Sequence, residues 1–199
     1  MLRERVRIGL AHVVQALREP EAFAAQWHQQ TARYPLEVWT ALLVTAIAGT
    51  TTYGMTMGLL SPQATTVITK SIACTFAAGM AWTISLPALY ILNSLAGSRL
   101  SASTTLLAAL VTVSWGGLAM IASIPINWFL SVAVPHAGFV LIVNLVVFAG
   151  VGIAMADTFQ RVMARLEPGR PLVAVWWIAL VSVIGMELFY AFDLFHFTV

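Results

Sequence analysis

The chain has 199 residues, of which 60% are hydrophobic and only 9% are charged, and its formal net charge is +2. Soluble domains carry about 25% charged residues, so the composition excludes a soluble globular protein and indicates an integral membrane protein. A spanning helix needs about 20 apolar residues, which leaves room for at most about six spans and no separate soluble domain.

The basic residues are distributed unevenly along the chain. Nine arginines precede the first apolar run or fall in the connections expected on that same side of the membrane, and Lys70 alone falls on the other side. Because cytoplasmic segments carry the excess of Lys and Arg, this asymmetry predicts a cytoplasmic N-terminus. The chain is expected to cross the membrane five times, and this odd number places the C-terminus outside.

Residues 1–33 form a cytoplasmic segment ahead of the membrane domain. Apolar residues recur at helical spacing from Leu2 to Leu17, with Arg3, Arg7 and Arg18 on the opposite side, which predicts an amphipathic helix over residues 2–18. Such a helix lies on the inner leaflet, where each basic residue gains about 1 kcal/mol from anionic lipid. The alternative is a helix that docks on a partner or a neighbouring subunit. Pro20 begins a second, short helix.

Residues 34–199 are expected to be an all-α bundle of five membrane-spanning helices, at about 36–60, 67–95, 103–124, 138–160 and 171–192. In the first span, Gly54 and Gly58 form a small-residue step among threonines. Steps of this kind let helix backbones approach closely, so they indicate packing within the bundle or, alternatively, a dimer contact.

The second span carries the most distinctive pattern of the chain. Leu86-Pro87-Ala88-Leu89-Tyr90 is followed by Asn93, Leu95 and Gly97-Ser98-Arg99-Leu100-Ser101. Pro87 predicts a packed kink, because neighbouring helices or hydroxyl groups can satisfy the carbonyl that it frees. Asn93 and Gly97 fit the end of a helix, and Arg99 fits its exit into the cytoplasm.

This segment resembles small bacterial five-helix membrane proteins that are grouped loosely with the Yip1 superfamily. The resemblance implies a five-span bundle in the bacterial inner membrane with a cytoplasmic N-terminus. It brings no catalytic residue.

An apolar segment bounded by two prolines, residues 125–135, follows the third span on the outer side and includes Asn127 and Trp128. It is too short to span, so it is either a re-entrant or interfacial piece, or a Trp-anchored surface loop or outward extension of the span. His136 follows it directly.

Polar residues are rare inside the predicted spans. Asn144 suits an interhelical hydrogen bond better than a ligand contact. Lys70 and Glu187 are expected at similar depth near the outer surface, where opposite charges would pair inside the bundle, although each could instead extend to the headgroups. On the cytoplasmic side, Arg161 and Arg165 follow the fourth span and are candidate contact residues together with Arg99.

The sequence contains no phosphate-binding glycine loop, no pair of metal-ligating Cys or His residues and no basic aromatic surface for nucleic acid. We therefore expect no cofactor, no metal and no enzymatic activity. Two functions remain. One is a structural or assembly protein that forms homo-oligomers or supports a partner membrane protein. The other is a channel or transporter for a small ion or solute that uses Glu187 and Lys70.

Overall fold

A computed structural model describes residues 2–59, 61, 63–169 and 173–196 of the chain. The described residues form seven α-helices and no strand, which confirms the predicted all-α class. The helices are α1 (Leu2–Arg18), α2 (Pro20–His28), α3 (Leu36–Gly58), α4 (Ala64–Leu95), α5 (Ala102–Ala133), α6 (Ala137–Leu166) and α7 (Val173–Ala191). The predicted start of the last span, at residue 171, lies outside the described residues.

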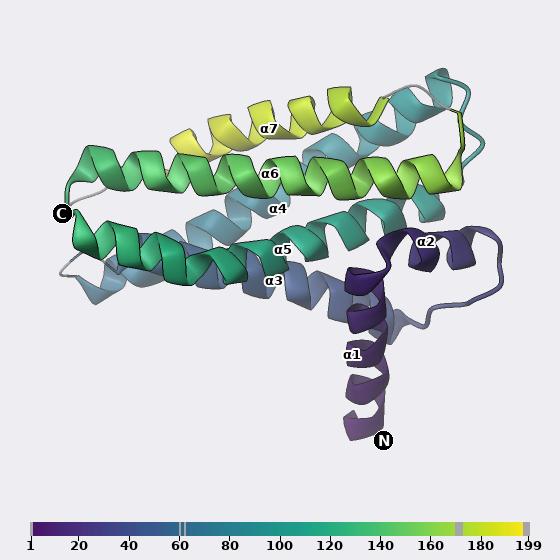
Figure 1. The fold of residues 1–199 in the computed structure, drawn as a ribbon, viewed down its shortest axis with the longest axis horizontal. Coiled ribbons are helices and arrows are strands. Elements are labelled where there is room, and N and C mark those ends of the chain that lie inside the picture. Colours follow the sequence, from purple (N-terminus) through teal and green to yellow (C-terminus); the bar gives the residue numbers. More distant parts are fainter. Residues whose placement is uncertain (1, 60, 62, 170–172, 197–199) are drawn as a thin grey trace.

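Helices α3 to α7 run along the long axis of the molecule, whereas α1 crosses that direction at one end and extends beyond the bundle (Figure 1). The chain passes from α2 to α3, from α4 to α5 and from α6 to α7 at this end, which we call the arginine end. The opposite end carries the connections from α3 to α4 and from α5 to α6, together with the end of the described chain. This alternation puts Arg33, Arg99 and Arg165 in or near the same group of connections.

Helix α3 is central, because it packs extensively against both α4 and α5. Glycines make this close packing possible. A Cβ atom added at Gly54 would lie 2.7 Å from the Cβ of Cys74 in α4, and one at Gly49 would lie 2.2 Å from the carbonyl oxygen of Gly117 in α5. Distances this short leave no room for any side chain, so small residues at these positions determine how the three helices meet.

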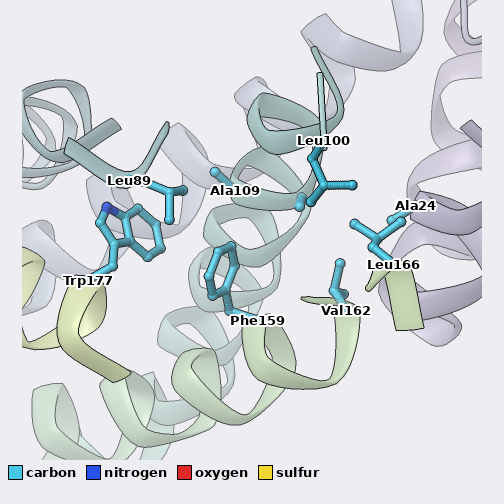
Figure 2. Packing of buried hydrophobic residues seen from close by; sticks show 9 residues of the cluster. Ala24, Leu89, Leu100, Ala109, Phe159, Val162, Leu166 and Trp177 are labelled. Atoms are coloured by element: carbon cyan, nitrogen blue, oxygen red, sulfur yellow. The ribbon is translucent and has the colours of Figure 1, made fainter. Parts of the chain in front are cut away.

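The largest group of buried side chains lies toward the arginine end, where α4, α5, α6 and α7 come together. Figure 2 shows Trp177 of α7 pointing toward Leu89 of α4 and Phe159 of α6. The Trp177 side chain is fully buried, and its indole nitrogen donates a 2.9 Å hydrogen bond to the backbone carbonyl of Ser85. A buried indole N–H is costly without a partner, so this bond fixes α7 against α4.

Helix α4 continues through Pro87 and ends in the expected way. Gly97 adopts a φ of 82°, while the backbone N–H groups of Gly97 and Ser98 bond to the carbonyls of Ser94 and Asn93. This Schellman arrangement needs a left-handed residue just past the helix, a conformation that glycine adopts without strain.

The segment from residue 125 to 135 is not re-entrant. Helix α5 runs through Pro125 without interruption as far as Ala133. Its 32 residues correspond to a length of about 48 Å, well beyond a hydrocarbon core of about 30 Å. A proline inside a helix is tolerated when the neighbouring elements hold the chain, and here α5 packs on both α3 and α6. The predicted extension of the third span is therefore correct for most of this segment.

Three helices of the described chain, α4, α5 and α6, are long enough and apolar enough to cross a membrane. This supports a membrane protein on length and composition. Helix α3 falls short because it contains six threonines among its 23 residues. In α7, the described apolar run, Ala179–Ala191, is shorter than a span.

Candidate functional site

A buried polar cluster links three helices in the half of the bundle away from the arginine end. The hydroxyl of Tyr53 in α3 donates a 2.8 Å hydrogen bond to Oδ1 of Asn144 in α6. Nδ2 of Asn127 in α5 approaches the same oxygen at 3.4 Å, and Nδ2 of Asn144 donates to the carbonyl of Val140. All three cluster side chains are at least 98% buried. Asn144 thus makes the interhelical bond that its position predicted.

One atom of this cluster has no partner among the described residues. Oδ1 of Asn127 is buried and accepts no hydrogen bond. A buried acceptor without a donor costs about 1–3 kcal/mol, so Asn127 is the least satisfied member of the cluster. The sequence interpretation placed Asn127 in an outer segment and did not connect it with Asn144, and it did not identify Tyr53.

Lys70 and Glu187 do not pair. The Lys70 ammonium donates hydrogen bonds to the backbone carbonyls of Asp193 and His196, the second at 2.8 Å, whereas Glu187 is exposed and no ion pair joins it to Lys70. The helices themselves are neighbours as expected, because α7 packs on α4. The prediction failed because it omitted the turn that follows α7.

That turn is a second left-handed helix end. Asp193 has a φ of 57°, and the N–H of Leu194 bonds to the carbonyl of Phe189. The chain folds back and presents backbone carbonyls near Lys70, and the C-terminal end of a helix attracts a cation. Lys70 therefore interacts with the end of α7 and its following turn rather than with Glu187.

The small-residue step formed by Gly54 and Gly58 packs against another helix of the same chain. Added Cβ atoms at Gly54 and Gly58 would meet backbone atoms of Ser71 and Val67 in α4 at 2.8 and 2.6 Å. The structure thus shows that this step serves packing within the bundle. Helix α4 covers the face of α3 that a dimer contact would require.

The three residues that were predicted on the outer side, Asn127, Trp128 and His136, differ in their exposure. Trp128 is half exposed, and His136 is exposed at the residue preceding α6, while Asn127 is buried. At the other end of the bundle, Asn93 is also buried, and its Nδ2 has no partner among the described residues.

The arginine end contains ion pairs, of which the one between α6 and α2 was not predicted from the sequence. Arg161 lies 2.6 Å from Glu21 of α2 and 2.9 Å from Asp157 of its own helix. Glu167 accepts hydrogen bonds from the Ser98 hydroxyl and the Arg99 backbone N–H, which ties the connection after α6 to the one after α4. Arg161 thus bridges α6 and α2 through side chains 140 positions apart.

The other arginines proposed as cytoplasmic contacts differ from Arg161. Arg7, Arg18, Arg99 and Arg165 are exposed, and within the described chain no ion pair engages their guanidinium groups. The side chain of Arg3 lies outside the described part of the structure.

Two apolar grooves lie between helices. One, of about 440 Å³, is lined mainly by α3, α4 and α5. The other, of about 480 Å³, lies between α6 and α7. Among the described residues, no three His, Cys, Asp or Glu side chains gather as they would around a metal ion.

These features define an all-helical bundle with helices suited to a membrane, a small buried polar cluster and two apolar grooves. No protein-family model, curated protein or solved structure matches the chain.

Proposed function

We propose that this protein is a non-enzymatic assembly protein of the bacterial inner membrane, Yip1-like in its topology. In this proposal α3 to α7 cross the bilayer, the arginine end faces the cytoplasm and α1 lies along the inner leaflet. The chain acts by binding a second copy of itself through the groove between α6 and α7.

The observation that supports this function is the open groove between the last two helices. Aromatic rings join α6 and α7 at two levels: Phe159 meets Trp177 toward the arginine end, and Phe148 meets Phe189 farther along. The groove includes Phe148 and Phe189 and extends from them toward the arginine end, where Gly152 of α6 and Gly185 of α7 line it.

The glycines in this region differ from those inside the bundle. A Cβ added at Gly152 would meet nothing within 4 Å, and one at Gly185 would only touch Ala81 at 3.8 Å. Helices associate in membranes through small residues that allow close backbone approach. Gly152 and Gly185 leave this approach open to a helix from outside the chain, and closed two-fold dimers are the commonest assemblies.

A single substitution tests the proposal. Gly152→Leu would place a side chain in the groove, and its Cβ would meet no atom of the monomer within 4 Å, so we expect the variant to fold normally but to lose the dimer. The measurement is molar mass by light scattering in mild detergent. Gly150→Leu is the matched control, because Gly150 is an exposed glycine of the same helix with nothing within 4 Å and does not line the groove.

Cysteine cross-linking gives an independent measurement. Cys74 is buried, so a cysteine introduced at the exposed Ile153 would be the accessible thiol, and Ile72→Cys on α4 provides an exposed control. We expect disulfide-linked dimers from Ile153→Cys alone. A monomeric mass for the wild-type chain, together with no cross-linked dimer from Ile153→Cys, would refute the proposed assembly.

The second candidate function is transport of a small ion or solute, and the unpaired Oδ1 of Asn127 favours it. Intramembrane polar groups often mark transport paths. In this alternative the path would involve Asn127 and Asn144, because Lys70 and Glu187 do not face each other. Ion flux into proteoliposomes that is lost in Asn127→Leu would support transport over assembly.

A further inference from the structure

The groove between α3 and α4 follows from the way these two helices separate. Near their connection they touch: an added Cβ at Gly58 would meet Val67 at 2.6 Å, and the hydroxyls of Thr51 and Thr75 lie 2.8 Å apart. Beyond this point the helices diverge toward the arginine end (Figure 1). Because α4 and α5 make only limited contact, the space between α3 and α4 stays open at the side, and residues of α5 form its floor.

The resulting groove has a volume of about 440 Å³ and an almost entirely apolar lining. Its rim includes exposed residues of both helices, among them Leu36, Leu43 and Ile47 on α3 and Gly79 and Thr83 on α4. A groove with an exposed rim on the side of a membrane bundle opens to the hydrocarbon of the bilayer. Its length runs from Leu36, at the start of α3, to Met120 in the second half of α5.

Charge at one end of the groove indicates what kind of molecule fills it. Arg33 lies three residues before Leu36, and Arg99 lies in the connection that leads into α5, whose Leu106 lines the groove. Both arginines are exposed, and within the described chain neither guanidinium has a hydrogen-bonding or ion-pairing partner. Two unpaired arginines in the connections that lead into groove-lining helices complement a molecule with an anionic head and a long apolar tail.

The lining also carries donors suited to the membrane interface. Trp39 and Trp82 both line the groove, and neither indole N–H donates to another described residue, unlike that of Trp177. Tryptophan is enriched where the headgroups meet the hydrocarbon. Trp39 lies one turn into α3, which is the depth expected for this interface on the cytoplasmic side.

We propose that this groove binds one anionic phospholipid of the cytoplasmic leaflet, with an acyl chain between α3 and α4 and the phosphate at Arg33 and Arg99. The lipid fills the space that remains between α3 and α4. This inference uses the orientation given under the proposed function but not the dimer, since the α6–α7 groove is formed by other residues.

The test measures quenching of tryptophan fluorescence by phospholipids with brominated acyl chains, with the full-length protein reconstituted in bilayers. Brominated phosphatidylglycerol and brominated phosphatidylcholine are compared at increasing mole fractions in an unbrominated background. We expect wild-type fluorescence to be quenched at a lower mole fraction of phosphatidylglycerol than of phosphatidylcholine. Native mass spectrometry should show one retained phosphatidylglycerol per chain.

Two sets of variants locate the binding site. Gly79→Leu places a side chain where the glycine leaves open space, so the preference for phosphatidylglycerol should disappear, while Gly150→Leu, an equally open exposed glycine elsewhere, should preserve it. Thr83→Leu serves the same purpose if Gly79→Leu fails to fold. Replacing Arg33 and Arg99 together by Gln should raise the required mole fraction of phosphatidylglycerol about thirtyfold.

Equal quenching by the two lipids in the wild-type protein, or an unchanged preference in both Gly79→Leu and Thr83→Leu, would overturn the proposal. The result is separable from the assembly test, because Gly152→Leu should abolish the dimer and leave the lipid preference intact. A monomeric protein that still retains phosphatidylglycerol would refute the assembly function alone.

Discussion

At the scale of single residues, the asparagines of the buried cluster are not equivalent. Asn144 accepts from Tyr53 and Asn127 and donates to Val140, so it satisfies groups on two other helices and on its own. Asn127 contributes one long hydrogen bond and leaves its own oxygen unpaired. Position in the network, rather than burial, separates a residue that stabilises the bundle from one that weakens it.

This difference gives a prediction for thermal unfolding in detergent. Asn144→Leu leaves the Tyr53 hydroxyl without an acceptor and should destabilise the protein by about 1–3 kcal/mol. Asn127→Leu removes an unsatisfied oxygen from a buried position, so the melting temperature should stay the same or rise. Equal destabilisation by both substitutions would contradict this assignment and would indicate that Asn127 Oδ1 has a partner in the membrane.

At the scale of helices, α1 is held to the bundle on one side only. Gly9 packs against α3, where an added Cβ would meet the Ala41 Cβ and the Glu37 carbonyl at 3.2 Å, and Val13 is also buried. Leu10 and Val14, in contrast, are more than half exposed. The apolar surface of α1 therefore divides between the bundle and the surroundings, and the exposed part suits the inner leaflet of the proposed topology.

The docking of α1 can be tested by hydrogen exchange. Gly9→Val crowds the contact with α3 and should release the helix, so backbone amides of residues 2–18 should exchange faster. Ala11→Val is the matched control. Ala11 is exposed, and it lies two residues after Gly9 in the same helix. Slow exchange in both variants would show that membrane lipid, not α3, holds α1 in place.

The elements were predictable from the sequence to different degrees. Apolar length and the Gly97 helix end were sufficient to place α3 to α6, because both are local signals. The pairing of Lys70 failed because the deciding feature was a turn at Asp193, a residue with no glycine-like signature. Tyr53 and Glu21 were missed because their partners, Asn144 and Arg161, lie 91 and 140 positions away, and nothing in one sequence connects them.

At the scale of the whole molecule, the connections sort into two ends that match the charge distribution of the sequence. The segments with Arg33, Arg99 and Arg165 meet at one end, and the turn beside Lys70 is at the other. A reporter fused after Val199 should therefore be active only on the outer side of the membrane, and one fused before Met1 only in the cytoplasm. A cytoplasmic signal from the C-terminal fusion would contradict both the five-span count and the orientation.

The central place of α3 has a consequence for how the protein reaches the membrane. On the proposed topology α3 is the first span to leave the ribosome, yet its threonines make it the least favourable of the long helices for transfer into lipid. Its glycines find their contacts only after α4 and α5 have been synthesised. Stable insertion of the first span should thus depend on the arrival of the next two, so that biogenesis proceeds through a three-helix unit rather than one span at a time.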